Sequence, residues 1–278
     1  MQAAGNHFVV LDARETGERD WASLAVWLCR ERSGPGGDGL LVVLDGQAAP
    51  VRMRMFNPDG TEDDCGNGLR CVALYARERG RAPNAEFAVE TRTGTKPVEV
   101  LGAGLRADVR TGMGKALLDP AAIPILLERP NALEFSLHGG GREFTASSVF
   151  TGSTHTVIFE RPDDGQFHAW SRSIETHDLF PQRTSVLWTS LGPEPTSGET
   201  RASVRIWERG VGETLACGTG AAAVAVVLRC TGRAPGDVRV QSRGGELRVH
   251  VEDDLAVVLT GPAAFVYRGV WIDTPDEL

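Results

Sequence analysis

Lysine is nearly missing from this chain of 278 residues, because only two of its 29 basic residues, Lys96 and Lys115, are lysines. Enzymes that use pyridoxal phosphate hold it as a Schiff base on a lysine. Lys96 lies in the turn-like stretch TRTGTKPVE, and Lys115 lies in the glycine-rich stretch TGMGKAL. Neither setting is typical of the floor of a cofactor site. We therefore expect chemistry without a cofactor, and we expect no metal.

The chain also lacks a CxxC pair, the spacing most typical of zinc and redox sites. Its five cysteines are Cys29, Cys65, Cys71, Cys217 and Cys230. An odd number without paired spacing fits neither a secreted disulfide framework nor a zinc centre. We expect reduced thiols and a cytoplasmic protein, with Cys29, Cys71 and Cys230 as core residues.

Long apolar runs and an excess of basic charge are missing as well. No stretch approaches the roughly 20 apolar residues that a membrane-spanning helix needs, and the N-terminus has no basic start typical of a signal peptide. The formal net charge of −8 argues against a general surface for nucleic acid or an anionic membrane. The expected partner is a small amino-acid substrate, with no nucleic acid and no membrane, and a homodimer is left open.

Four short segments recur in the same order along the chain, which indicates an internal duplication. The matching pairs are 5–12 with 152–160, 37–41 with 183–187, 65–68 with 217–220, and 89–94 with 240–245. Their offsets are similar, since 217 − 65 = 152, 240 − 89 = 151 and 152 − 5 = 147. This period is too long for a solenoid repeat. We expect two lobes, one of residues 1–115 completed by 262–278, and one of residues 116–261.

Short β-branched stretches bounded by Gly, Pro, Asp or Asn predict strands in both halves. They are 8–13, 40–45, 51–56, 87–92, 107–112, 156–160, 203–208, 238–243, 247–253 and 256–261. Helical patterns are fewer: one near 21–32, and two that begin at CGNGLRCVALYARERG and CGTGAAAVAVVLRCTG. The second cysteine-led helix is so apolar that we expect it to be the buried centre of its lobe. The predicted fold class is α/β (α+β).

Cys65 and Cys217 each stand where a glycine-rich turn enters a predicted helix. Backbone N–H groups and the positive end of the helix dipole would point at each sulfur and lower the thiol pKa from about 8.5. The same N–H groups could receive a carboxylate. If both helix ends converge on one carboxylate, its α-carbon lies between two sulfurs. One thiolate then removes the α-proton, and the other thiol supplies a proton to the opposite face.

Each cysteine motif alone has simpler interpretations. A cysteine before a glycine is more often a small buried residue. A facing pair could be a redox couple, although neither motif is CxxC. A CGNG turn could bind phosphate, although it matches neither the Walker nor the dinucleotide spacing. The occurrence of two motifs at equivalent positions is what favours proton transfer.

The blocks FNPDG with CGNGLRC, and WERGVGETLACGTGAAA, closely resemble the two signature blocks of the diaminopimelate epimerase family. GNHFVVLD and GGDGLLVV resemble its N-terminal blocks, so the likeness covers essentially the whole chain. The resemblance implies two pseudo-symmetric lobes, each a β-barrel-like sheet around a central helix, with the active site between the lobes. It implies cofactor-independent epimerisation of an amino-acid α-carbon, that of LL- and meso-diaminopimelate.

The resemblance also implies roles for individual residues. Cys65 and Cys217 match the acid/base pair, while His155 and Glu208 match groups that tune them. The positions that match the substrate site are Asn6, Asn57, Gly66, Asn67, Arg209, Gly218 and Thr219. Within that set, the two residues after each cysteine match the cradle of the reacting carboxylate, and Arg209 suits a distal carboxylate as a bidentate fork.

Taken without the family, three of these residues have ordinary structural interpretations. Asn57 opens the β-turn signal NPDG. Arg209 beside Glu208 is typical of a surface ion pair. His155 on an apolar strand is more often a satisfied core histidine.

Two positions depart from the family pattern, because Ser153 and Ser185 stand where the family usually has asparagine. The loop from Glu62 to Cys65 is also one residue short. A serine offers one hydroxyl in place of an amide, which changes the number and reach of donors at the far end of a substrate. A racemase acting on histidine, ornithine or glutamate is therefore an alternative, and a catalytically silent small-ligand binding protein is a second.

Overall fold

The computed structural model describes residues 1–192, 199–234 and 236–271. The chain divides into two compact units, the first made of Met1–Thr111 and Thr260–Leu278 and the second of Gly112–Leu259. The chain passes from one unit to the other inside strand β8 (Arg106–Lys115) and inside strand β17 (Ala256–Ala264). Among the described helices, none is long and apolar enough to cross a membrane.

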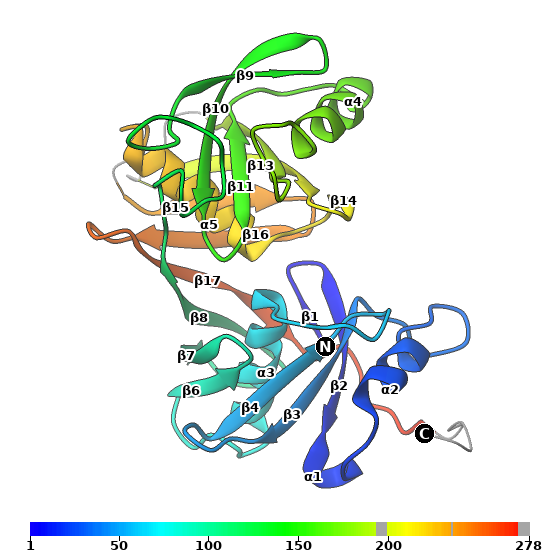
Figure 1. Ribbon diagram of the computed structural model, residues 1–278. Helices are drawn as coiled ribbons and strands as arrows, with labels where there is room; N and C mark the ends of the chain where they lie inside the picture. The colour runs from blue at the N-terminus through cyan, green and yellow to red at the C-terminus, as the bar shows by residue number, and fades with distance from the viewer. Residues whose placement is uncertain (193–198, 235, 272–278) are drawn as a thin grey trace. The chain divides into compact units, whose positions relative to one another are not determined.

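The first unit combines a set of short strands with three helices (Figure 1). Its strands are β1 (Gln2–Ala3), β2 (Asn6–Asp12), β3 (Gly39–Asp45), β4 (Val51–Phe56), β5 (Glu62–Asp63), β6 (Glu86–Thr91) and β7 (Gly94–Leu101). Its helices are α1 (Ala13–Thr16), α2 (Trp21–Leu28) and α3 (Gly66–Glu78). β2 runs parallel to β3, β3 antiparallel to β4, β4 parallel to β6, and β6 antiparallel to β7.

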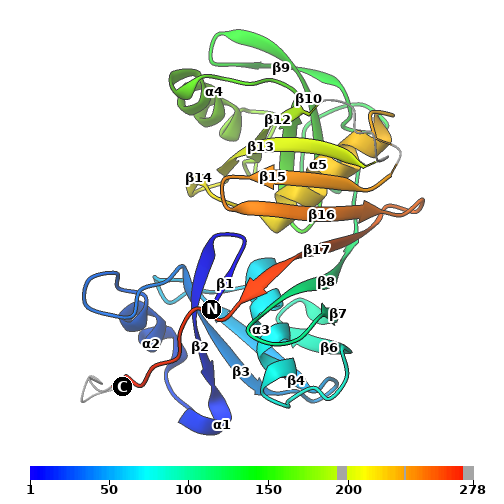
Figure 2. The ribbon, with the colours of Figure 1, turned by 180° about the vertical axis from the view of Figure 1, so that it is seen from behind.

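The second unit repeats this order of pairings (Figure 2). Its strands are β9 (Phe135–Gly139), β10 (Arg142–Phe150), β11 (Thr154–Ile158), β12 (Ser185–Leu191), β13 (Thr200–Glu208), β14 (Gly212–Thr214), β15 (Val238–Ser242) and β16 (Gly245–Val251). Its helices are α4 (Asp164–Glu175) and α5 (Gly218–Cys230). β11 runs parallel to β12, β12 antiparallel to β13, β13 parallel to β15, and β15 antiparallel to β16.

Strand registers agree residue by residue between the two units. Phe8 pairs with Gly39 in the first unit, and His155 pairs with Ser185 in the second. Equivalent positions read from these and the neighbouring registers are Asn6 and Ser153, Phe8 and His155, Gly39 and Ser185, Phe56 and Trp207, Asn57 and Glu208, and Val89 and Val240. Four of these six correspondences, all except Phe56 with Trp207 and Asn57 with Glu208, are those that the repeated segments predict. The internal duplication and the mixed α/β class are therefore confirmed.

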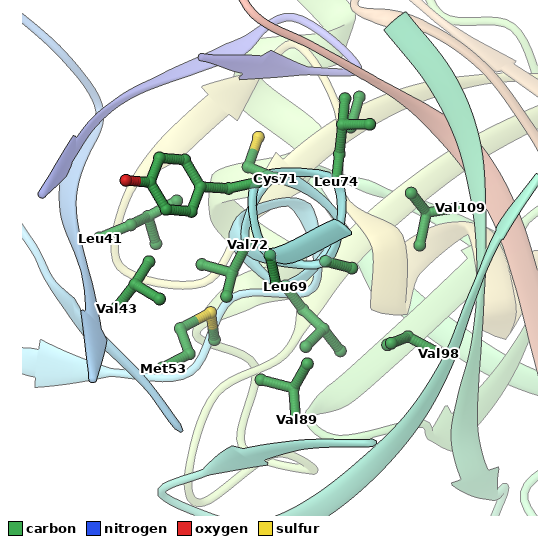
Figure 3. Close-up of a cluster of buried hydrophobic side chains, with 14 of the residues drawn as sticks. Leu41, Val43, Met53, Leu69, Cys71, Val72, Leu74, Val89, Val98 and Val109 are labelled. Atoms are coloured by element: carbon green, nitrogen blue, oxygen red, sulfur yellow. The ribbon is translucent and has the colours of Figure 1, made fainter. Parts of the chain in front are cut away.

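Helix α3 is the centre of the first unit, where it packs against β1, β2, β3, β4 and β7. Residues 67–76 of this helix are all buried, so its apolar side chains meet strands on several sides. Figure 3 shows Leu69, Val72 and Leu74 among valines and other apolar side chains from the surrounding strands. Burying such a set of side chains is the main force that holds helix and strands together.

Helix α5 has the equivalent place in the second unit, packed against β10, β11, β12, β13, β15 and β16. Every residue from 220 to 228 is buried, which confirms the prediction of a central apolar helix. A second cluster, rich in aromatic side chains, lies beneath α4, where Phe144 contacts the rings of Trp170 and Trp188 edge to face.

Some elements differ from the expectations. The helix near 21–32 is shorter, because α2 ends at Leu28. The elements that were not predicted are helices α1 and α4 and strands β1, β5, β7, β9, β10, β12 and β14. Asp163 and Gln166 nevertheless form a capping box at the start of α4. Cys29 and Cys71 are buried as expected, but Cys230 is partly exposed because it is the last residue of α5.

Candidate active site

Cys65 is the N-cap of α3. Its backbone is extended (φ −140°, ψ 116°), and its sulfur accepts a hydrogen bond from the backbone N–H of Gly68 at 3.4 Å. A side chain at position 68 would force the buried Leu41 to shift, since a Cβ there would lie 2.7 Å from Leu41 Cδ2. The cap conformation and the bond from Gly68 hold the sulfur at the N-terminus of α3, where backbone N–H groups have no partner within the helix.

Cys217 is the N-cap of α5 in the same conformation, with φ −140° and ψ 115°. Its sulfur accepts from the backbone N–H of Gly220 at 3.4 Å and lies 3.3 Å from Thr219 Oγ1. Two cysteines in equivalent positions thus have the same cap geometry and the same backbone donor. Each unit presents one sulfur at the positive end of its central helix.

Glu208 distinguishes the second sulfur from the first. It lies at the end of β13, partly buried, and its Oε1 accepts from Thr214 Oγ1 at 2.7 Å. Burial raises the pKa of Glu208. Burial, and next the nearby charge of Glu208, raise the pKa of Cys217 to about 12, and the hydrogen bonds from Thr219 and Gly220 only partly offset this.

The prediction that the helix end lowers the pKa of both thiols is therefore wrong for Cys217. Desolvation and a neighbouring carboxylate both disfavour a thiolate there, and together they outweigh the favourable helix end. At neutral pH Cys217 is a protonated thiol. It is therefore suited to donate a proton.

His155 is a buried histidine on β11 that contacts Thr219, two residues after Cys217. Its Nε2 lies 2.9 Å from Thr219 Oγ1 and 3.0 Å from Ser153 Oγ, while its Nδ1 is buried and has no hydrogen-bond partner among the described residues. Burial, and then the positive charge of Arg209, lower the pKa of His155 to about 3. The imidazole is therefore neutral and holds the hydroxyl of Thr219, which in turn contacts the sulfur of Cys217.

A continuous line of polar side chains lies beside Cys65 in the first unit. Arg70 donates to Asn67 Oδ1 at 2.6 Å, Asn67 Nδ2 donates to Asn6 Oδ1, and Asn6 Nδ2 donates to Asp38 Oδ2 at 3.2 Å. Asn67 and Arg70 are buried. The structure thus connects two of the predicted site residues, Asn6 and Asn67, directly to each other.

The glycine after Cys65 leaves the N-terminus of α3 open. A Cβ at Gly66 would have no described neighbour within 4 Å. In the second unit the carbonyl of Thr219 accepts a hydrogen bond from Thr151 Oγ1 at 2.8 Å, which fixes the backbone of this turn. Uncovered N–H groups at a helix N-terminus are favourable for an anion such as a carboxylate.

The remaining predicted residues make local contacts. Asn57 forms the expected turn, because its carbonyl accepts from the N–H of Gly60 at 2.9 Å. Arg209 is exposed; its N–H donates to Ser185 Oγ at 3.1 Å, and its guanidinium donates to the carbonyl of Gln182 at 3.0 Å. Ser185 therefore holds the backbone of the arginine that the family pattern places at a distal carboxylate.

In the second unit the structure gathers Cys217, Thr219, His155, Ser153 and Glu208 through direct contacts. Sequence reasoning missed the residues that support the predicted site residues of both units: Asp38 and Arg70 in the first, and Thr151 and Thr214 in the second. Arg70 had a signal, since it interrupts the apolar run of GNGLRCVALYA, whereas a threonine hydroxyl carries no such signal.

Neither lysine lies in a buried setting. Lys115 pairs with Asp254 at 2.6 Å and is 63% exposed, and Lys96 is partly exposed on β7. Within the described residues, no group of three or more His, Cys, Asp or Glu side chains is placed to hold a metal ion.

Comparison with known proteins decides the family. A family model described as diaminopimelate epimerase matches residues 1–118 and 147–266. The chain belongs to the diaminopimelate epimerase family. A diaminopimelate epimerase of Desulforudis audaxviator (strain MP104C) is 42% identical over 277 residues, which are 98% of each chain. One of Moorella thermoacetica is 39% identical over 274 residues, covering 97% of this chain and 96% of its own length.

Solved structures of more distant proteins share the fold of this family member. A phenazine biosynthesis protein of the PhzF family from Bacillus anthracis has a TM-score of 0.66 at 17% identity, covering 98% of this chain and 97% of its own. A probable proline racemase from Agrobacterium radiobacter K84 has a TM-score of 0.61 at 16% identity, covering 99% and 93%. At such identities the likeness concerns the fold alone.

Proposed function

We propose that this diaminopimelate epimerase family member is an isomerase that interconverts LL- and meso-diaminopimelate without a cofactor, with Cys65 and Cys217 acting on opposite faces of the α-carbon. Family membership supports the reaction and the substrate. The observation that carries the mechanism is the identical N-cap geometry of the two cysteines in duplicated units. Two matched acid/base groups, one on each face, suit a reaction that removes a proton from one face and returns one to the other.

The reacting carboxylate is held in this proposal by the open N-termini of α3 and α5. One cysteine, as thiolate, takes the α-proton: the C–H bond breaks, an S–H bond forms, and the electron pair is spread onto the carboxylate. Backbone N–H groups stabilise that charge as it develops. The other cysteine, as thiol, then transfers its proton to the opposite face of the carbon. The reverse reaction exchanges the two roles.

The surroundings of the two sulfurs give them different starting states in this mechanism. Cys217, with its pKa raised by burial and by Glu208, starts as the acid. Cys65 then starts as the base. Neutral His155 keeps the hydroxyl of Thr219 beside the Cys217 sulfur, so that a thiolate formed after proton donation has a donor at hand.

Ser153 and Ser185 bear on the choice of substrate. Ser185 holds the backbone of Arg209, and Ser153 contacts His155, so both hydroxyls support residues that the family pattern assigns to the site. The fork of Arg209 suits a second carboxylate, which diaminopimelate has and histidine and ornithine lack. This favours diaminopimelate over those two alternatives.

The test is α-proton exchange in D₂O, followed by NMR, with LL- and meso-diaminopimelate, L-histidine, L-ornithine and L-glutamate. We expect exchange and epimerisation with diaminopimelate, and loss of epimerisation in Cys65→Ala and in Cys217→Ala. Exchange only with another amino acid would contradict the proposed substrate. Absence of turnover with every substrate, together with tight binding of one, would favour the silent binding protein.

A further inference from the structure

Arg70 is a fully buried arginine in the first turns of α3, with a relative exposure of 0%. Its guanidinium donates to the carbonyl of Gly66 at 3.3 Å and to Asn67 Oδ1 at 2.6 Å, and its Nε is buried and has no hydrogen-bond partner within the residues that the structure describes. In the described part of the chain it forms no ion pair with a carboxylate. Burying a charge that makes no direct contact with a carboxylate is costly, so a role beyond packing has to be considered for it.

The position of this charge is also unfavourable for the helix. Cations are destabilising near the N-terminus of a helix, where the dipole is already positive. Burial lowers the pKa of Arg70. Of the three groups whose negative charge opposes this shift, Cys71 is itself kept neutral by a pKa raised to about 12, which leaves Cys65 and the carboxylate of Asp108. An anion bound at this end of α3 would add to the stabilisation of this charge.

The second unit has no counterpart of this cation. Five residues after Cys65 stands Arg70, whereas five residues after Cys217 stands Ala222, which is fully buried. The side chain that follows the equivalent glycine is Asn67 in one unit, held by Arg70, and Thr219 in the other, held by neutral His155. The two units therefore share the cysteine N-caps but differ in the side chains that support the turn after each cysteine.

Arg70 also fixes the direction of the polar line that leads to Asn6. An arginine can only donate, so Asn67 must turn its oxygen to Arg70 and its NH₂ group to Asn6. Asn6 then accepts from Asn67 and turns its own NH₂ group to Asp38, whose ionised carboxylate can only accept. Both ends of the line thus select the same orientation of both amides.

We propose that Arg70 is a positioning residue for the epimerisation, which holds Asn67 and, through it, Asn6 with their N–H donors toward the reacting carboxylate. Each NH₂ group has a second hydrogen beyond the bond that it makes within the line. If either amide flipped, a carbonyl oxygen would face the carboxylate and repel it. Arg70 adds a positive charge near the Cys65 sulfur, which favours its thiolate. The proposal rests on the proposed function, because it needs an anionic substrate at α3.

The experiment compares steady-state kinetics of Arg70→Met and Arg70→Lys with those of the intact enzyme. Methionine keeps the volume and apolar stem but has no donor, so we expect KM for diaminopimelate to rise about tenfold, the effect of losing one hydrogen bond to a charged group. Lysine restores one donor and the charge, so Arg70→Lys should recover part of the loss. Iodoacetamide should also alkylate Cys65 more slowly in Arg70→Met than in the intact protein at pH 8.

Arg81→Met is the matched control. Arg81 is likewise buried in the first unit, but it pairs with Asp12 at 2.6 Å and with Asp45, so its role is structural. We expect this variant to lower the melting temperature and to leave KM and Cys65 alkylation unchanged when assayed below that temperature. If Arg81→Met raised KM as much as Arg70→Met does, general loosening of the unit would explain both results and the proposal would fall.

A double-mutant cycle with Asn6→Ala tests the route of the effect. If Arg70 acts through Asn67 on Asn6, the penalty of Arg70→Met on kcat/KM should shrink to about twofold or less once Asn6 is alanine, because coupled residues are not additive. Fully additive penalties would overturn the proposal. If the intact protein is active and Arg70→Met has the same kinetic constants, only the role of Arg70 is refuted. If the intact protein is inactive, the proposed function itself is refuted.

Discussion

His155 is the buried imidazole whose neutrality the site depends on, since burial and Arg209 lower its pKa to about 3. In the unfolded chain the pKa of a histidine is about 6.5. Between pH 6.5 and pH 3 the histidine is protonated in the unfolded state but not in the folded state. The free energy of unfolding must therefore fall as the pH is lowered through this range.

We therefore predict that acid destabilises the protein through His155. At pH 5 the unprotonated His155 lowers the free energy of unfolding by about 2 kcal/mol. This follows from the difference of about 1.5 units between the unfolded-state pKa and the pH, at about 1.36 kcal/mol per unit. Urea unfolding at pH 7 and pH 5 measures this, with His155→Gln as the comparison, because glutamine keeps a polar group at this position and does not titrate. Equal acid sensitivity in both proteins would show that His155 is not responsible.

Glu208 and Cys217 show how a side chain can reverse what the backbone favours. The sequence places both cysteines at helix N-termini and so predicts lowered thiol pKa values, but Glu208 comes from β13, nine residues before the cysteine. Sequence spacing does not reveal that this carboxylate faces the sulfur. The cap geometry could be predicted; the charge balance around it could not.

Removing the charge of Glu208 should lower the pKa of Cys217. In Glu208→Gln we expect iodoacetamide to alkylate Cys217 several times faster at pH 8.5 than in the intact protein, because a thiolate is no longer repelled by the ionised carboxylate. Mass spectrometry of the Cys217 peptide gives the rate, and Cys71, which is fully buried, serves as the unreactive reference. Unchanged or slower alkylation would contradict the assigned effect of Glu208.

Helices α3 and α5 start in the same way, but the space around their glycines differs. A Cβ at Gly68 would lie 2.7 Å from Leu41 Cδ2, whereas a Cβ at Gly220 would lie 3.2 Å from Leu187 Cδ2 and 3.4 Å from the sulfur of Cys217. A Cβ at Gly66 would meet nothing described within 4 Å. Substitutions at these three glycines can therefore distinguish an effect on packing from an effect on ligand binding.

Alanine at each of these glycines should give a distinct result. Gly68→Ala should lose about 1–3 kcal/mol of stability through overpacking, and Gly220→Ala should lose less while displacing the sulfur. Gly66→Ala should keep full stability and lose activity, because its methyl group would occupy the open end of α3. Denaturant unfolding and turnover with diaminopimelate check all three. Full activity in Gly66→Ala would contradict a carboxylate cradle at this helix end.

The duplication is the feature of the whole chain that sequence reasoning predicted best. Repeated segments anticipated the equivalence of Phe8 with His155 and of Gly39 with Ser185, which the strand registers confirm. Helix α4 was missed because its buried face holds only four residues among polar neighbours. The Asp38–Arg70 line was missed because its members are far apart in sequence and meet only through the packing of β2, β3 and α3.

The most direct test of the two-cysteine mechanism is where deuterium appears early in the reaction. LL-Diaminopimelate is incubated with the enzyme in D₂O, the reaction is stopped below about one-tenth conversion, and both isomers are isolated. If one cysteine removes the α-proton and the other supplies a new one, the meso product carries deuterium at the inverted carbon while recovered LL substrate remains protiated. Equal deuterium in recovered substrate and product at that stage would mean that a single group both removes and returns the proton, and would contradict the mechanism.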